Sequence, residues 1–170
     1  MVSLRYYTTA AFRTINQPLR DQERFEKGDR HPLPLTVWYI KEGIGKLRAV
    51  EADLPTAQDA VDLYRGMKGV SVPTEFISKG GSELAPMSTT KNLKVAVQYA
   101  ASERSVLLRL RTTTFMQRGA DLSFLSAFPG EAEVLYPPLT FLKPQGNGIQ
   151  TLFVDDATFD VVDVEPHFPS

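Results

Sequence analysis

The chain contains no cysteine and only two histidines among its 170 residues. Without cysteine it can form no disulfides, no thiolate metal sites and no cysteine nucleophile. His31 and His167 both lie in proline-flanked segments, and neither has a partner at metal-ligand spacing. The sequence therefore predicts no metal site and no histidine-based catalytic centre. The absence of cysteine fits a reducing cytosol, and it fits equally well a protein that is unfolded and exported without mispairing.

A charge imbalance and long apolar segments are also missing. The 19 basic and 20 acidic residues nearly cancel, so no electrostatic footprint for nucleic acid or an anionic membrane is expected. No apolar run approaches the length that a membrane span needs, and the first twenty residues lack the pattern of a secretory signal. Neither a G-x-G-x-x-G motif nor a P-loop occurs, so a Rossmann-type dinucleotide fold is not supported.

The remaining composition is that of an ordinary globular domain. Apolar residues make up 42% of the chain and charged residues 23%. The length suits one domain over residues 1–170, and the sequence shows no internal repeat. The sequence leaves the localisation open; it suits a soluble protein that acts in the cytosol, including one delivered there as an effector. We expect a monomer.

The N-terminal third is predicted to be largely helical. Apolar residues recur at helical spacing within residues 8–21, with Thr8 or Thr9 as the expected N-cap. Pro18 predicts that this helix bends or ends near Asn16 or Gln17. Charged residues, glycine and proline predict an exposed loop over residues 25–36. The segments that follow, up to Val50, fit either a helix or short strands.

In the rest of the chain, the pattern of apolar and turn-forming residues mainly predicts β-strands. Strands are expected around Leu63 and Tyr64 and over 72–78, followed by a loop over 79–86. Residues 92–103 form an amphipathic pattern typical of a helix. Further strands are expected at 105–112 and, at least three in number, within 133–144 and 149–166. The order of elements predicts an α+β fold.

Three short motifs carry residues suited to chemistry. They are Arg65-Gly66, Ser88-Thr89-Thr90 and Glu131-Ala132-Glu133. Each has an ordinary structural explanation when taken alone: a packed surface arginine, a helix N-cap, and the solvated edge of a hairpin. The two glutamates stand at positions i and i+2 where a strand is expected to begin, so they would share one face. Like charges that close are unfavourable unless a cation meets them.

In this order, the three motifs resemble the Arg–Ser–Glu signature of the mono-ADP-ribosyltransferases, in their arginine-modifying E-x-E branch. The middle motif departs only in Thr90, which keeps a hydroxyl where the family has a final serine. Residues 6–20 (YYTTAAFRTINQPLR) are similar to the entrance segment of the family, and Phe128 falls where this branch carries an aromatic residue. The resemblance runs from about Tyr7 to the last strands.

The resemblance implies a fold and an activity. The expected fold is the ADP-ribosyltransferase-like α+β fold, in which two bent β-sheets form an NAD cleft. Helices of the N-terminal third and the helix over 92–103 would pack on one side. The expected activity is transfer of ADP-ribose from NAD, a co-substrate, to an arginine of a target protein, with release of nicotinamide. No metal is implied, and the protein would be a toxin or effector.

The resemblance also implies a role for each motif residue. Arg65 would hold the NAD pyrophosphate with its planar guanidinium. Glu133 would stabilise the oxocarbenium-like ribose that forms as nicotinamide leaves, and Ser88 would hold the Glu133 carboxylate in place. Glu131 would bind the acceptor guanidinium and act as its base, with Phe128 as an aromatic platform. The positive charges of the ribose and of the acceptor guanidinium would thus explain why two glutamates stand so close together.

Other assignments and other functions stay open at this level. Gly66, Thr89 and Tyr99 are further candidates for contacts with NAD, and Arg104 is an alternative to Tyr99; packing or surface positions explain these residues as well. The enzyme could instead be an NAD glycohydrolase or a transferase with a different acceptor. A non-catalytic NAD-binding or protein-interaction domain is the third alternative. The chain could also be the catalytic part of a longer protein.

Overall fold

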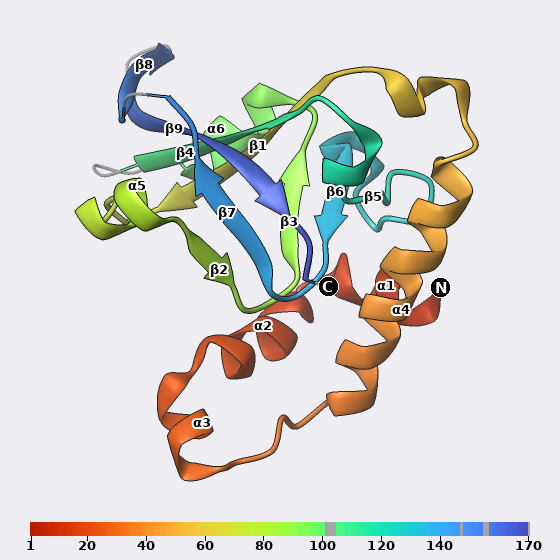
Figure 1. Cartoon of the computed structure of the whole chain (residues 1–170). Helices are drawn as coiled ribbons and strands as arrows, with labels where there is room; N and C mark the ends of the chain where they lie inside the picture. Colours follow the sequence, from red (N-terminus) through yellow and green to blue (C-terminus); the bar gives the residue numbers. More distant parts are fainter. Residues whose placement is uncertain (101–104, 147, 155–156, 170) are drawn as a thin grey trace.

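The computed structural model describes residues 1–100, 105–146, 148–154 and 157–169 (Figure 1). Helices dominate its first third, and a large bent sheet with two further helices makes up the rest. Within the described residues, no helix combines the length and the apolar character that a membrane crossing requires.

The N-terminal third folds into four helices. They are α1 (Val2–Tyr7), α2 (Phe12–Arg20), α3 (Gln22–Lys27) and α4 (Pro34–Glu51). The predicted end of α2 near Asn16 is wrong, because the helix continues through Pro18 to Arg20. Proline removes one backbone hydrogen bond and crowds the preceding turn, but the buried Ile15 holds that part of the helix against the protein. Ala11, rather than Thr8 or Thr9, is the N-cap.

The predicted loop over residues 25–36 is only partly a loop. The end of α3 and the start of α4 lie inside it. The Asp21 side chain accepts a hydrogen bond from the Arg24 backbone at the start of α3, and Gly28 ends that helix at φ 72°. The segment that fitted either helix or strands is a single 18-residue helix, α4, which buries Ile40 and Ile44 four residues apart.

Nine strands form one hydrogen-bonded sheet in the described part of the chain. They are β1 (Val61–Lys68), β2 (Gly81–Glu83), β3 (Met87–Thr90), β4 (Ser105–Thr112), β5 (Ala120–Asp121), β6 (Glu133–Tyr136), β7 (Thr140–Pro144), β8 (Gln150–Val154) and β9 (Ala157–His167). Their order is β2-β7-β9-β4-β1-β3-β6-β5, with β8 paired to β9. The β4–β9 pair is parallel and the other pairs are antiparallel.

The two expected sheets are joined at a single position. Strands β1 and β3 share one register pair, Tyr64 with Thr90, whereas β1 pairs with β4 along its whole length. The six strands around β4 and β9 and the three strands β3, β6 and β5 are therefore two halves of a bent sheet. This joint is the place where the halves diverge.

The strands around Leu63, at 105–112 and within 133–144 and 149–166 are confirmed. The helix expected over 92–103 is confirmed as α6 (Leu93–Ala100), and residues 101–103 lie outside the described residues. The strand expected over 72–78 is wrong, because Thr74–Lys79 form the helix α5. Its Phe76 and Ile77 pack against the sheet from one helical turn, so their aromatic and β-branched character misled the prediction. The expected loop over 79–86 contains β2. Three short 3-10 helices complete the part of the chain that the structure describes: η1 (Pro55–Gln58), η2 (Phe115–Gln117) and η3 (Pro129–Glu131).

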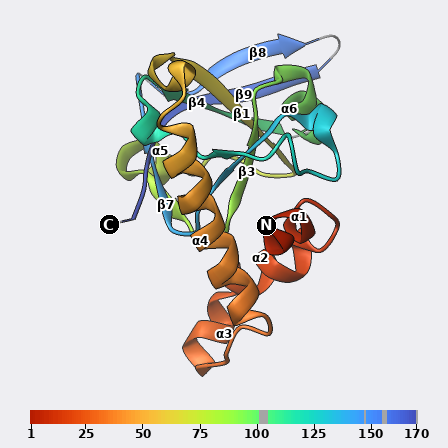
Figure 2. The ribbon, with the colours of Figure 1, turned by 90° about the vertical axis from the view of Figure 1, so that its right-hand side faces the viewer.

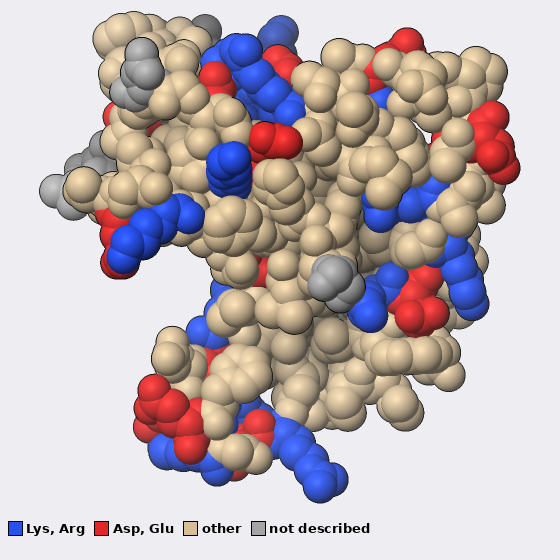
Figure 3. Space-filling model, in the orientation of Figure 1, with Lys and Arg blue, Asp and Glu red and all other residues tan. Residues whose placement is uncertain are grey.

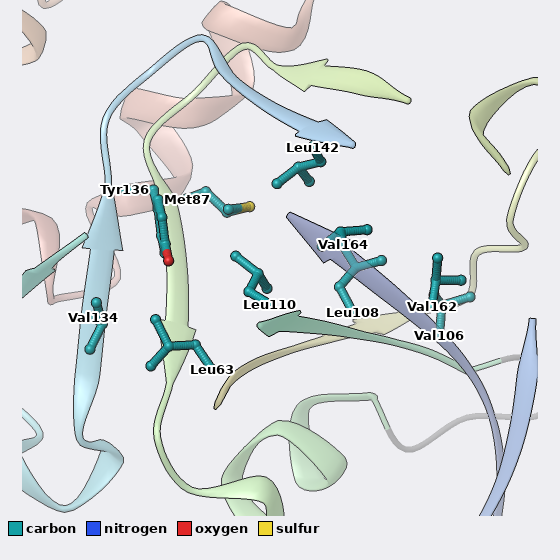
Figure 4. Packing of buried hydrophobic residues seen from close by; sticks show 10 residues of the cluster. All are labelled: Leu63, Met87, Val106, Leu108, Leu110, Val134, Tyr136, Leu142, Val162 and Val164. Atoms are coloured by element: carbon teal, nitrogen blue, oxygen red, sulfur yellow. The ribbon is translucent and has the colours of Figure 1, made fainter. Parts of the chain in front are cut away.

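Three clusters of buried side chains stabilise these layers. The largest lies within the bend of the sheet and includes Leu63, Leu110 and Tyr136 (Figure 4). Helices α1, α2 and α4 pack on β5 and β6, at one end of the sheet (Figures 1 and 2). Helix α6 packs on β1, β4 and β9 instead. It therefore covers a different half of the sheet from the N-terminal helices, contrary to the expectation that both cover one sheet.

Close packing of α6 on β1 depends on Gly66. A Cβ atom at this position would lie 1.9 Å from the Ala96 carbonyl oxygen and 3.0 Å from the Ala100 Cβ. Because the nearer atom belongs to the helix backbone, no side-chain rotation can make room for it. Gly66 therefore sets the distance between the strand that carries Arg65 and helix α6.

We expect Gly66→Ala to destabilise the protein by roughly 1–3 kcal/mol, as overpacking does elsewhere. Gly45→Ala is the matched control, since Gly45 is exposed within α4 and a Cβ there meets nothing within 4 Å. The control should be more stable than the wild type by about 0.5–1 kcal/mol, because alanine favours helix. Urea unfolding of both variants measures the difference. Equal stability of Gly66→Ala and the wild type would contradict this account of the packing.

Candidate active site

A cavity of about 420 Å³ opens where the two halves of the sheet meet. Its walls come from α1, α2, β1, β3, α6 and the turn around η3. All the predicted site residues within the described ranges line it: Arg65, Gly66, Ser88, Thr89, Tyr99, Phe128, Glu131 and Glu133. Arg104 lies outside the described residues. The fold thus brings together motifs that are far apart in the sequence.

Glu133 is the deepest acidic group of the cavity. It is the first residue of β6, is only 5% exposed and pairs across the ladder with Thr90. Ser88 lies two residues before Thr90, on the same face of the sheet, and its hydroxyl hydrogen-bonds the Glu133 carboxylate. Burial raises the pKa of Glu133; the bond from Ser88 lowers it and the nearby charge of Glu131 raises it. Ser88 is therefore placed to hold this carboxylate.

Glu131 does not stand on the strand. It ends the 3-10 turn η3, and Ala132 follows with φ 47°, in the left-handed region. The expectation that Glu131 and Glu133 project from one face of a strand is wrong, because Pro129 starts the turn and Ala132 reverses the backbone before β6 begins. The Thr90 hydroxyl donates to the Glu131 carbonyl at 2.6 Å, and the Tyr99 hydroxyl donates to Glu131 Oε1 at 2.6 Å. Both carboxylates still line one cavity.

Arg65 projects from β1 and lines the cavity. Its Nη1 donates to the Ser88 carbonyl at 2.9 Å, and its Nη2 lies 3.9 Å from Glu83 Oε2. Arg20, from α2, makes two hydrogen bonds to the same Glu83 carboxylate, at 2.8 and 3.0 Å. Burial lowers the pKa of Arg65 and the Glu83 charge raises it, but a guanidinium stays charged in proteins. One carboxylate thus orders two guanidinium groups.

Gly66 and Thr89 each have a structural role that explains the residue type at that position. Gly66 is required by the approach of α6, as described above. Thr89 is buried and donates its hydroxyl to the Val134 carbonyl at 2.7 Å. It also alternates with Ser88 along β3, so its side chain projects to the other face of the strand. Phe128 and Tyr99 are 55% and 59% exposed and lie at the rim of the cavity.

Tyr7, Asn16 and Arg20 are among the residues of α1 and α2 that also line the cavity, and the sequence assigned them no role. Tyr7 donates to the Pro86 carbonyl at 2.9 Å and accepts from Asn16 Nδ2 at 2.9 Å, and burial raises the pKa of Tyr7 to about 12. Asn16 Oδ1 is buried and has no hydrogen-bond partner within the described part of the chain. Arg20 completes the set. All three residues lie in the segment 6–20, whose similarity to the family's entrance segment was the only sequence signal that could have indicated them. The contacts that bring them together form only in the folded chain.

A second cavity, of about 290 Å³, lies on the far side of Arg65. Its walls are largely apolar and include Met67, Val72, Phe76 and Leu142. Arg65 lines both cavities. Elsewhere, acidic and basic side chains are interspersed over the face shown in Figure 3. No group of three or more histidine or acidic side chains that could hold a metal ion occurs within the described ranges.

Comparisons with known proteins identify the fold and the family. A sequence comparison with curated proteins finds no significant match. Among solved structures, the fold is similar to the ADP-ribosyltransferase toxin Plx2a from Paenibacillus larvae, with a TM-score of 0.67 and 18% identity over 98% of this chain and 84% of that one. The ADP-ribosyltransferase Vis from Vibrio splendidus, solved with agmatine, gives a TM-score of 0.65 and 20% identity over 96% and 72%.

Exoenzyme S from Pseudomonas aeruginosa, solved with human 14-3-3 protein beta and bound to carba-NAD, gives a TM-score of 0.59 and 19% identity over 95% of this chain and 70% of that one. At these identities, the similarity to the three solved structures establishes the fold of this chain alone. A family model for ADP-ribosyltransferase exoenzymes matches residues 2–145, which is most of the chain and includes all three motifs. The chain belongs to the ADP-ribosyltransferase exoenzyme family.

Proposed function

We propose that this protein transfers ADP-ribose from NAD to an arginine of a target protein and releases nicotinamide. The observation that carries the proposal is the placement of Arg65, Ser88, Glu131 and Glu133 around one cavity. The family supports ADP-ribosyl transfer. The assignment of arginine as the acceptor rests on the Glu131 side of the site.

Arg65 is the proposed ligand of the NAD pyrophosphate. A guanidinium offers a planar and permanently charged set of donors that matches phosphate oxygens. The hydrogen bond to the Ser88 carbonyl and the nearby Glu83 hold this side chain in place before NAD arrives. Arg20 shares Glu83 with it and supplies a second positive charge. The carba-NAD bound to exoenzyme S supports NAD as the co-substrate.

Glu133 is the proposed catalytic carboxylate. Cleavage of the bond between ribose and nicotinamide develops positive charge on the ribose. A carboxylate that is buried and already held by Ser88 stabilises that charge more strongly than water does, and most of all in the transition state. Nicotinamide needs no general acid to leave, because its ring nitrogen is cationic in NAD. The proposed chemistry therefore needs no histidine.

Glu131 and Phe128 are the proposed acceptor-binding residues. The Glu131 carboxylate, at the rim side of Glu133, can accept hydrogen bonds from a guanidinium and take the proton that must leave before attack on the ribose carbon. The exposed ring of Phe128 offers a face for the same cation. The agmatine bound to Vis, itself a guanidinium compound, supports an arginine-like acceptor. Hydrolysis of NAD by water would compete when no acceptor is bound.

We propose further that the protein acts as a monomer on a target protein, after delivery as an effector. The family description as exoenzymes and the similarity to toxins such as Plx2a support this context. The near balance of 19 basic and 20 acidic residues does not favour nucleic acid as the target. Incubation of a lysate with labelled NAD, followed by peptide mass spectrometry of the labelled proteins, identifies the target and the modified residue type together.

Arg65→Lys should bind NAD at least about tenfold more weakly, because lysine keeps the charge but loses the bidentate geometry. Calorimetry is done in the Glu133→Gln background, so that NAD is not consumed during the titration. Arg30→Lys, at an exposed position, is the matched control and should bind NAD normally. If Arg65→Lys and Arg65→Ala both kept the affinity of the parent, the assignment of the pyrophosphate to Arg65 would be wrong.

The two glutamates should separate by reaction. Glu133→Gln removes the charge that faces the ribose and should slow both transfer and hydrolysis by about 10²–10³-fold. Glu131→Gln should sharply reduce transfer to agmatine while most of the hydrolysis remains, because the ribose is still stabilised. Nicotinamide release and labelling of agmatine are measured in parallel. Equal loss of both activities in Glu131→Gln, or full transfer, would argue against arginine as the acceptor.

Glu133→Gln should also stabilise the fold at pH 7. Because burial raises the pKa of Glu133 above its ordinary 4.5, the folded state binds the proton more tightly than the unfolded state. The free energy of unfolding therefore falls as the pH rises from the unfolded-state pKa through the higher folded-state pKa, because the charged carboxylate is the form that burial destabilises. Urea unfolding should show a gain for the variant at pH 7 that vanishes near pH 4. Glu26→Gln, at an exposed position, is the control and should change the stability little. A Glu133→Gln variant that is less stable than the wild type at pH 7, with the control unchanged, would refute the prediction.

A further inference from the structure

The turn that carries Glu131 receives a side-chain contact from a distant helix. Tyr99 lies in the last turn of α6, 32 residues before Glu131, and donates its hydroxyl to Glu131 Oε1 at 2.6 Å. A hydrogen bond of this length to a carboxylate is strong. The rest of the tyrosine is 59% exposed, so core packing does not explain its position.

The Glu131 side chain depends on this contact for its orientation. The backbone of the turn is fixed by the Thr90 hydroxyl, which donates to the Glu131 carbonyl, and by the Glu131 amide, which donates to the Phe128 carbonyl at 3.0 Å. Among the described residues, Tyr99 provides the hydrogen bond to the carboxylate itself. It binds Oε1, which leaves Oε2 available to a ligand. A glutamate without such a partner would sample many rotamers.

The phenol is a donor throughout the neutral pH range. The hydrogen bond to Glu131, with a smaller contribution from burial, raises the pKa of Tyr99 to about 12. The hydroxyl therefore keeps its proton and does not act as a base. Its effect on the site is to hold a negative charge in one place.

Helix α6 is itself fixed relative to the strand that carries Arg65. Ala96 and Ala100 pack against Gly66 at a distance that excludes any side chain there. Tyr99 lies between these two alanines in sequence, so its position is set by the same packing. A continuous path of contacts thus joins Gly66 on β1, helix α6 and the Glu131 carboxylate.

We propose that Tyr99 is a positioning residue that holds Glu131 for the acceptor guanidinium and so sets the ratio of transfer to NAD hydrolysis. This inference rests on the proposed arginine-directed activity. The acceptor binds the free oxygen of a carboxylate whose other oxygen is already held, and loses less conformational freedom in doing so. Water needs no such alignment, so hydrolysis depends on Tyr99 less than transfer does.

Tyr99→Phe tests the role of the hydroxyl, since it keeps the ring and removes only the donor. We expect transfer to agmatine to fall about tenfold, mainly through a higher KM for agmatine, while nicotinamide release in the absence of agmatine falls less. Tyr39→Phe is the matched control, because Tyr39 is an exposed tyrosine of α4 away from the cavity. It should leave both rates unchanged.

A double-mutant cycle tests whether Tyr99 acts through Glu131. Tyr99→Phe should lower residual transfer no further in the Glu131→Gln background if the hydroxyl serves that carboxylate. An equal additional loss in that background would overturn the proposal. Equal loss of transfer and hydrolysis in Tyr99→Phe would also overturn it, since that result indicates a contact with NAD or a general structural effect.

The outcomes distinguish this inference from the proposed function. If the wild type hydrolyses NAD but labels neither agmatine nor any protein arginine, the acceptor is not arginine and the inference fails with that proposal. If the wild type labels agmatine, Glu131→Gln abolishes the labelling and Tyr99→Phe retains it in full, the proposed function stands and only the role of Tyr99 is wrong.

Discussion

The single pairing of Tyr64 with Thr90 is the constraint on which the site depends. It holds the two halves of the sheet together while their other strands diverge. Arg65 follows one member of this pair, and Glu133 lies opposite the other. The hydrogen bond from Arg65 to the Ser88 carbonyl spans the same joint. The cavity therefore exists because the sheet nearly separates there, and its functional groups border the separation.

Cationic and anionic side chains both line the cavity. The Glu83 carboxylate orders Arg20 and Arg65, and Glu131 and Glu133 line the same cavity. NAD has an anionic pyrophosphate and a cationic nicotinamide ring, so it carries a partner for each kind of charge. Burial makes each charge costly for the fold and more effective toward a bound ligand.

Some of these features could be predicted from the sequence and others could not. Apolar patterns located β4 and α6, because burial of one face leaves a period that single residues do not obscure. The same logic failed for α5, where Phe76 and Ile77 reach the core from a helix. The family motifs brought Arg65, Ser88 and Glu133 together, but the left-handed Ala132 and the contact of Tyr99 with Glu131 depend on tertiary packing that no local pattern records.

The backbone at Ala132 has a consequence for how the acceptor site could change. An alanine at φ 47° holds a conformation that L-residues adopt at a cost of about 1–2 kcal/mol, whereas glycine would adopt it freely. Alanine also restricts the alternative conformations of the turn, so the spacing between the two glutamates is fixed in advance. Residues 128–130 precede this point and are exposed. A side-chain substitution at Phe128 can therefore alter the contact with an acceptor while Ala132 still fixes the step from the turn into β6.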